Sequence, residues 1–335
     1  MAAIPNKADE FKQRLVHSTG LTESAISAAW PEWWSEAADV SASSQADLRF
    51  TLARKLGLDP RSLLDDETPK FVWEDSAKFK NFRGDMQDAR PAISSFGTAL
   101  GRMIINGCTN YVPPYNYNPL ELRQSILASR PFVDITGLIA FMWGVGIPVI
   151  HLRVHPLAAK HMCAMTVRVG DRYAVLLARD ANYPASTAFY LAHEIAHIAL
   201  GHLSDGGAVV DMDDPTERVE ETDPEEISAD RYALQLLTGY PTLDVENTGK
   251  GRSARQLATE VMRAAQQNAI EPGTLALCYG YTTKDWATAQ KAMHYIYDKP
   301  LPVWEGINRI AATQIQWGEL SDESSSYVRA VMGGI

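Results

Sequence analysis

The stretch Ser186-Thr-Ala-Phe-Tyr-Leu-Ala-His-Glu-Ile-Ala-His-Ile-Ala-Leu-Gly-His202 contains the pattern His-Glu-x-x-His, formed by His193, Glu194 and His197. Residues i and i+4 share one face of a helix, so both imidazoles can bind a single ion. Glu194 follows the first histidine, where its carboxylate can take a proton from a water molecule on that ion. The pattern therefore predicts a zinc-binding helix. Two ordinary histidines on a half-buried helix are the alternative interpretation.

The flanking residues predict where this helix begins and ends. Pro184 lies near the expected start, and Gly201 stands where a C-terminal cap is expected. Leu191, Ile195 and Ile198 supply apolar surface. We therefore expect a buried helix that carries the two histidines.

A catalytic zinc usually has three protein ligands and a water molecule, so a third ligand is needed. His202 lies one position short of the spacing at which a third histidine would bind, and we expect it to cap the helix end. Glu226 and Asp230 share one face of a later helix at 225–237. There Glu226 can bind the metal while Asp230 orients a ligand histidine. Glu225 is the competing ligand, but it has no acidic partner at i+4.

The composition limits the classes of protein to which the chain can belong. Its 335 residues allow two or three modest domains, and 46% hydrophobic residues are typical of a globular chain. A formal net charge of -10 argues against a protein that coats nucleic acid nonspecifically. Three widely spaced cysteines form no disulfide framework, and the first residues contain no apolar signal core. We therefore expect a cytoplasmic protein.

One uncharged segment, Ile135–Leu152, approaches the length of a membrane span. Gly144, Gly146 and Pro148 interrupt it. It is better interpreted as a buried helix through Trp143 followed by a strand at 148–152. No membrane partner is expected.

Residues 1–66 are expected to form a small helical domain, with helices near 9–18, 22–30, 31–38, 45–56 and 59–64. The series resembles a repressor-type helix-turn-helix domain, in which the third helix enters the DNA major groove. Here that helix carries Glu32 and Glu36 and no Arg or Lys, although DNA is commonly contacted by basic or amide side chains. We expect a degenerate DNA-binding domain that contacts protein.

Residues 67–118 are expected to be a connector, with one helix near 92–105 and a Pro/Asn-rich loop before residue 119. Its stretch 70–83 interleaves aromatic residues with the basic residues Lys70, Lys78, Lys80 and Arg83. Such a pattern can stack bases and follow a phosphate backbone, which makes single-stranded DNA a possible partner. Aromatic packing between domains is the alternative, because Glu74 and Asp75 interrupt the charge.

From residue 119 the pattern changes and predicts an α+β core at 119–240. Helices are expected at 120–127 and 133–143, and strands at 148–152, 163–169 and 173–178. The last two strands are joined by a tight Gly170-Asp171 turn and form a hairpin. An acidic stretch at 204–223 is interpreted as a solvated loop between the two ligand helices. Residues 241–335 are expected to form a C-terminal helical region that ends in a Pro-containing tail.

These motifs together resemble the ImmA/IrrE family of zinc metallopeptidases. The resemblance rests on the stretch 193–202, the hairpin before it, and Glu226-x-x-Ala-Asp-Arg-Tyr-Ala233 after it. Within that family, the helical N-terminus and long connector are most similar to peptidases of regulators beside CBASS immune operons. The resemblance implies a gluzincin-like, thermolysin-like core with a small mixed or antiparallel sheet and a zinc helix.

The family resemblance also implies a function. Members cleave a partner helix-turn-helix repressor and so switch on stress, mobile-element or phage-defence genes. Applied to this chain, it implies Zn²⁺ bound by His193, His197 and Glu226, with Glu194 as the base. The alternative from another class is a DNA-binding transcriptional regulator whose zinc is structural or whose peptidase is inactive.

Two further expectations concern control and substrate binding. A thiolate is a good zinc ligand, so Cys108, or alternatively Cys163, is a candidate to block the metal in the resting state. The ordinary interpretation of either cysteine is a small buried hydrophobic residue. A substrate is expected to lie extended and to pair its backbone with an exposed strand of the hairpin region.

Overall fold

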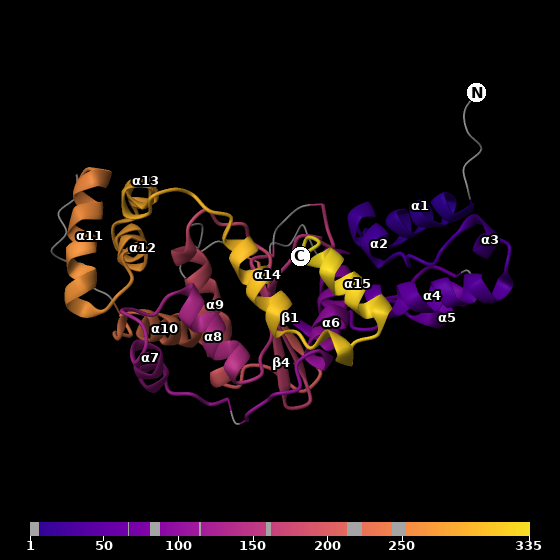
Figure 1. Ribbon diagram of the computed structural model, residues 1–335, viewed down its shortest axis with the longest axis horizontal. Coiled ribbons are helices and arrows are strands. Elements are labelled where there is room, and N and C mark those ends of the chain that lie inside the picture. Colours follow the sequence, from indigo (N-terminus) through magenta and orange to yellow (C-terminus); the bar gives the residue numbers. More distant parts are fainter. Residues whose placement is uncertain are drawn as a thin grey trace.

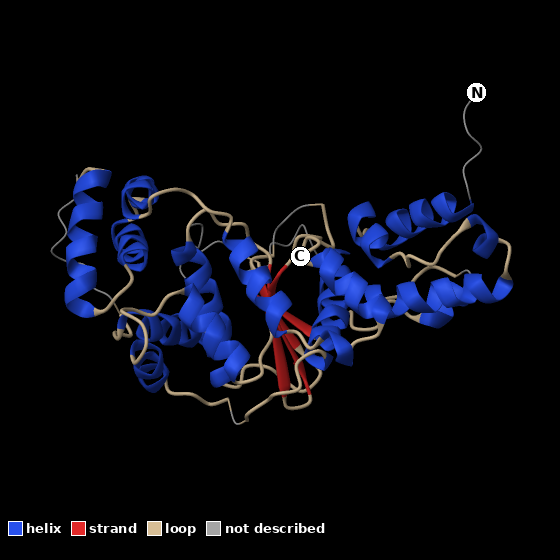
Figure 2. Ribbon diagram, in the orientation of Figure 1, coloured by secondary structure: helices blue, strands red, loops and turns tan. Residues whose placement is uncertain are grey.

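The fold places a small sheet between two groups of helices. In the computed structural model, residues 7–65, 67–80, 88–113, 115–158, 162–212, 223–242 and 252–335 are described. Within these ranges the chain is α+β and mostly helical, with one mixed sheet. Figure 1 shows the N-terminal helices at one end of an elongated molecule and α11–α13 at the other. Figure 2 shows the strands at the centre. Of the expected sites, Arg83 and most of the acidic loop lie outside the described residues.

The helices agree closely with the sequence expectation over most of the chain. Starts are fixed by capping side chains such as Thr22, Ser41 and Asp134, which accept from backbone N–H groups of the first turn. The α-helices are α1 (Lys7–Thr19), α2 (Glu23–Ala29), α3 (Glu36–Asp39), α4 (Ala42–Leu56), α5 (Pro60–Leu64), α6 (Arg90–Asn106), α7 (Pro119–Leu127), α8 (Ile135–Gly144), α9 (Pro184–Ala199), α10 (Pro224–Thr238), α11 (Ala254–Asn268), α12 (Pro272–Thr283), α13 (Trp286–Ile296), α14 (Val303–Gln314) and α15 (Asp322–Val331).

The sheet has the strand order β1-β5-β3-β4-β2. Its strands are β1 (Ala77–Lys80), β2 (Val149–His151), β3 (Ala164–Val169), β4 (Arg172–Leu177) and β5 (Ala208–Asp211). The expected hairpin is present as the antiparallel pair β3–β4. β5 is antiparallel to β3, while β1 and β2 run parallel to β5 and β4.

Helices α6 and α9 cover opposite faces of this sheet. Successive side chains of a strand point to opposite faces. On β3, Met165 and Val167 lie against glycines of α6, whereas the hydroxyl of Thr166 reaches Glu194 on α9. A Cβ atom on Gly101 would lie 2.9 Å from Val167, so glycine lets α6 approach the sheet closely.

The expected connector and the expected loop at 204–223 both need correction. Residues 77–80 of the connector form the outer strand β1, and α6 is a core helix with most of its residues buried. Residues 208–211 of the loop form the buried strand β5, because Val209 and Val210 pack into the core. The segment expected to be a connector thus contributes a strand to the central sheet and a helix to the core.

The substrate was expected to pair with an exposed strand of the hairpin region, and the hairpin strands β3 and β4 themselves offer no such edge. Strand β3 already pairs with β4 and β5, and β4 already pairs with β3 and β2. Both hairpin strands therefore have backbone partners on each side. In the described sheet, the outer strands are β1 and β2.

The third helix expected in the N-terminal domain, at 31–38, does not form as one element. A turn at Pro31–Trp34 precedes the short α3, whose N-cap is Ser35. The aromatic side chains there pack on one another instead, with the rings of Trp30 and Trp34 6.0 Å apart at their centroids. Residues 31–38 therefore do not supply the expected recognition helix.

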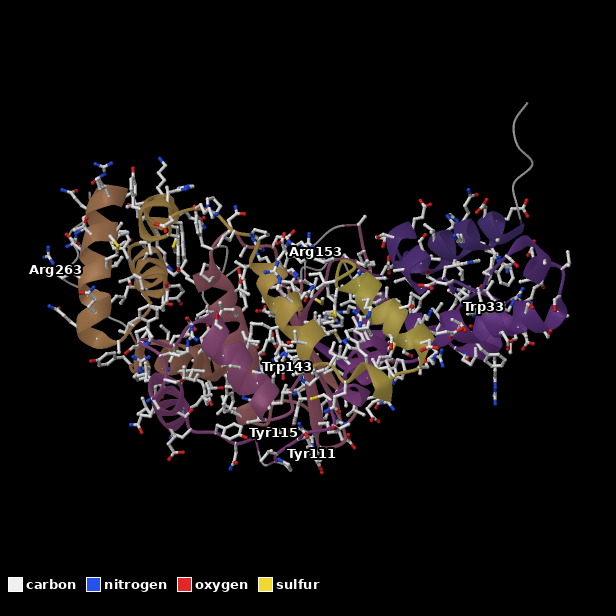
Figure 3. All side chains as sticks on the ribbon, in the orientation of Figure 1. Trp33, Tyr111, Tyr115, Trp143, Arg153 and Arg263 are labelled. Carbon is white, nitrogen blue, oxygen red and sulfur yellow. The ribbon has the colours of Figure 1, made fainter. Side chains whose placement is uncertain are left out.

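The C-terminal region divides into two parts. Helices α11–α13 form one small apolar cluster of their own, and α12 and α13 share a second one with Ala185 of α9. Helix α14 packs on β2, and α15 packs on α2 and α6. The expected Pro-containing tail is thus largely helical. Buried Asn308 of α14 holds it in place by hydrogen bonds to His151 and to the carbonyl of Met332. Figure 3 shows Trp33 in the N-terminal helices and Arg263 on α11 at opposite ends of the molecule.

Candidate metal centre

The candidate metal centre lies between α9 and α10, which pack side by side (Figure 1). Pro184 occupies the first turn of α9, as expected. α10 begins at Pro224, and the carboxylate of its N-cap residue Asp223 accepts from the N–H of Glu225 at 2.9 Å. Ala229 and Ala233 are fully buried, and such small side chains let the two helices lie close together.

His193, His197 and Glu226 form a buried group that could hold a metal ion. The two Nε2 atoms are 3.0 Å apart. The carboxylate oxygens of Glu226 lie 3.2 Å from Nε2 of His193 and 3.4 Å from Nε2 of His197. A tetrahedral zinc with bonds of about 2.0–2.1 Å has ligand atoms roughly 3.3–3.4 Å apart. The three residues therefore fit a zinc-sized ion.

The electrostatics of the site also favour a cation. Burial lowers the pKa of His193, but the hydrogen bond with Asp230 and the contact with Glu226 outweigh it and raise that pKa to about 10. The His193 ring binds Asp230 through Nδ1 at 2.9 Å, which leaves Nε2 directed at Glu226 and His197. Asp230 thus has the position expected for a residue that orients a ligand histidine.

The two adjacent acids of α10 have different surroundings. Glu226 is 1% exposed and lies against both histidines. The Glu225 side chain is 35% exposed and forms ion pairs with Lys78 and Lys80. The geometry therefore brings Glu226, and not Glu225, to the histidines.

Glu194 is fully buried beside the centre. Burial raises its pKa to about 8, and the neighbouring His193 partly offsets this rise. Thr166 of β3 donates a hydrogen bond to Oε2 at 2.5 Å, whereas Oε1 accepts none from the described part of the chain. A buried carboxylate with one oxygen left without a donor is suited to accept a proton from a bound water molecule.

His202 closes the end of α9, as expected, but through its backbone: its N–H donates to the carbonyl of His197 at 3.0 Å. Its ring contacts a candidate ligand, because its Nδ1 lies 2.8 Å from Nδ1 of His197. Its Nε2 lies 3.5 Å from the hydroxyl of Ser228 on α10.

Lys78 and Lys80, expected as nucleic-acid contacts, lie on β1 beside the N-terminus of α10. Lys80 is 7% exposed, and its Nζ lies 2.6 Å from Asp223, 2.8 Å from Glu225 and 3.7 Å from Glu226. Burial lowers the pKa of Lys80, but these carboxylates raise it above its usual value. Its charge is therefore engaged within the molecule. Lys70 is exposed and pairs with Glu67, and nucleic-acid binding by this segment stays a prediction.

The three cysteines are buried and unbridged, and among the described residues none joins the metal-binding group. Cys108 follows α6, where burial raises the pKa of its thiol. The Sγ of Cys163 lies 3.8 Å from Nη1 of Arg179. A blocking role for either thiol stays a prediction.

Sequence reasoning missed two residues of the site, Thr166 and Asp211, and it assigned Lys80 to nucleic-acid contact. Asp211 is 3% exposed on β5 and raises the pKa values of both His193 and Glu194. The run Ala208-Val-Val before Asp211 was a strand signal inside the acidic stretch. No comparable local signal pointed from Lys80 to α10.

Comparison with protein family models, with curated proteins and with solved structures finds no match to this chain. Within the described residues, none of the helices is both long and apolar enough to cross a membrane.

Proposed function

We propose that the chain is a zinc-dependent endopeptidase with a gluzincin-type, thermolysin-like core. One observation carries the proposal: His193, His197 and Glu226 converge from two helices, and Glu194 is buried next to His193. Structural zinc sites usually have four protein ligands, whereas catalytic sites have three and an open position. Among the residues that the structure describes, the group has three members, which suits a site of the second kind.

The residues present suit the hydrolysis of a peptide bond. Zinc held at this site supplies a Lewis acid that polarises a carbonyl group and makes water more acidic. Glu194 accepts the proton of the attacking water and returns it to the leaving amine. Thr166 holds one oxygen of Glu194, so the other stays available for this transfer. Asp230 keeps the Nε2 atom of His193 turned towards the ion.

The proposed substrate is a partner helix-turn-helix repressor, cleaved to derepress a stress or phage-defence operon. This part rests on the family resemblance of the motifs. An extended substrate segment would pair with β1, the outer strand whose Lys80 lies beside Glu226. Single-stranded DNA is the proposed activator. A cytoplasmic location follows from the same assignment.

The second candidate function is a DNA-binding regulator with a structural or inactive zinc site. Two observations count against it. Residues 31–38 supply no continuous recognition helix. Glu194 is also buried beside the histidines, where a structural site has no use for a second carboxylate.

The test incubates the full chain with helix-turn-helix proteins encoded next to it, with and without single-stranded DNA. We expect the wild type to cleave one of them and Glu194→Gln to slow cleavage by about 10²–10⁴-fold while retaining zinc. Zinc content, measured by mass spectrometry, separates loss of the base from loss of the metal. Full turnover by Glu194→Gln would exclude Glu194 as the base. Equal repressor cleavage by a zinc-free chain would exclude the metallopeptidase.

The inhibitory thiol is tested in the same assay. Cys108→Ser is expected to raise basal cleavage if the thiol blocks the metal, and Cys163→Ser serves as the alternative. Cys278→Ser is the matched control, since Cys278 is also buried but lies on α12. Unchanged basal cleavage in both test variants would remove the thiol from the proposal.

A further inference from the structure

The two candidate histidine ligands are supported by different chemical groups. His193 has the carboxylate of Asp230 on its Nδ1, whereas His197 has the imidazole of His202 on its Nδ1. A carboxylate partner makes a ligand histidine more basic and donates more charge to the metal. A neutral imidazole orients the ring without adding a negative charge.

The direction of the His197–His202 hydrogen bond follows from the proposed metal ligation, on which this inference rests. His197 directs Nε2 at Glu226, so when it binds a metal through Nε2 its proton is on Nδ1. Nδ1–H of His197 then donates a hydrogen bond to Nδ1 of His202, which lies 2.8 Å away. The proton of His202 is left on Nε2, which faces the hydroxyl of Ser228 at 3.5 Å. That hydroxyl donates to the carbonyl of Glu225 at 2.9 Å.

The backbone places His202 at this position through a left-handed glycine. Gly201 has a φ of 73°, which favours glycine, and it turns the chain just after α9 ends. The N–H of His202 then donates to the carbonyl of His197 at 3.0 Å, which brings the two rings together. Lys78 of β1 donates to the carbonyl of His202 at 3.1 Å and holds it from the other side.

We propose that His202 is a positioning residue of the metal centre. It fixes the tautomer and orientation of His197 and, unlike a second carboxylate, would add no negative charge next to a bound metal ion. Through Ser228 it also links His197 to the first turn of α10, next to Glu226. Glu226 and His197 are thus held relative to one another by a path outside the metal.

The experiment compares three substitutions of His202 in the full chain. His202→Leu removes the acceptor, His202→Asn places an amide oxygen near the position of Nδ1, and His202→Asp places a carboxylate there. His155→Leu is the control, because His155 is also half-buried but lies in the loop after β2. Zinc affinity is measured by competition with a chromophoric chelator, the Co²⁺-loaded protein by its absorption spectrum, and folding by circular dichroism.

We expect His202→Leu to weaken zinc binding by roughly 10–100-fold, the usual cost of losing a partner of a metal ligand. His202→Asn should recover most of this loss. His202→Asp should bind zinc at least as tightly as the wild type, shift the Co²⁺ bands and cleave more slowly. Wild-type zinc affinity in His202→Leu would overturn the proposal. So would an equally weak His202→Asn that is fully folded, because packing would then be the role of His202.

The outcome is separable from that of the proposed function. A wild-type chain that binds zinc but cleaves no repressor would remove the peptidase assignment, while the affinities of the variants would still decide the role of His202. A wild-type chain with no zinc affinity would overturn both.

Discussion

The metal centre and strand β1 meet at two adjacent glutamates, yet only one of the two regions can be recognised from sequence. On the histidine side, Glu226 is buried against His193 and His197. On the lysine side, Glu225 is held by Lys78 and Lys80 of β1. Neighbouring positions of α10 therefore differ in role: Glu226 is a candidate metal ligand, whereas Glu225 forms ion pairs.

Buried charge therefore has two distinct roles in this part of the molecule. Around the histidines, buried acidic side chains lie where a metal ion could bind. Around Lys80, the chain supplies the cation, and its ammonium group neutralises the acids at the start of α10. The ion pairs of Lys80 support the histidine site, because Asp223 and Glu225, which Lys80 binds, lie just before Glu226 in the chain.

The largest expected effect is on zinc affinity, when Glu226 and Glu225 are each replaced by glutamine. Glu226→Gln should weaken zinc binding by more than about 100-fold, because it removes a direct ligand. Loss of a residue that only hydrogen-bonds to a ligand already weakens metal binding by roughly 10–100-fold. Glu225→Gln should leave zinc affinity close to that of the wild type. Chelator competition on both variants measures this. A larger loss in Glu225→Gln than in Glu226→Gln would mean that the ligand has been assigned to the wrong residue.

The next effect compares the two lysines of β1. Lys80→Met should lower the free energy of unfolding by about 2 kcal/mol, because the loss of the buried ammonium group leaves three carboxylates without their cationic partner. The loss is moderate because two of these carboxylates are still in contact with water. Lys78→Met, with the Lys78 side chain 50% exposed, should cost less than about 1 kcal/mol. Urea unfolding of the zinc-free proteins gives both values. Equal losses would show that burial of Lys80 contributes nothing to the support of α10.

The histidine side could be predicted because its signal is local. His193 and His197 are one helical turn apart, as are Glu226 and Asp230, so the period of the helix alone places each pair on one face. Most other helices and the β3–β4 hairpin are predicted for the same reason: their caps, turns and apolar periods lie within a few residues. The α+β class follows from these elements.

The lysine side could not be predicted because its partners are remote in sequence. Strand β1 is short, and Ala77–Lys80 becomes a strand only by pairing with Ala208–Asp211. The alternation of basic and aromatic residues there suits a nucleic-acid surface equally well, and only the pairing shows that Lys80 is buried. The contact between the rings of His202 and His197 could not be predicted for a similar reason. The spacing of His202 excludes it as a third ligand, but the turn at Gly201 that brings it to His197 depends on backbone geometry.

The smallest expected effect concerns a third lysine, which is buried away from the metal centre and so tests whether burial alone explains Lys80. Lys55 of α4 is 2% exposed, and its Nζ donates to the carbonyl of Ala29 at 3.1 Å. Burial lowers the pKa of Lys55 from its usual 10.5, the opposite of the shift at Lys80. The unfolded chain therefore binds more protons than the folded one, and stability should rise with pH as it approaches about 10.5.

Lys55→Met should remove this rise and, by removing the desolvation cost, stabilise the protein by about 1 kcal/mol at neutral pH. Urea unfolding between neutral and alkaline pH measures the slope, with exposed Lys70→Met as the control. A rise that persists in Lys55→Met would assign it to another group.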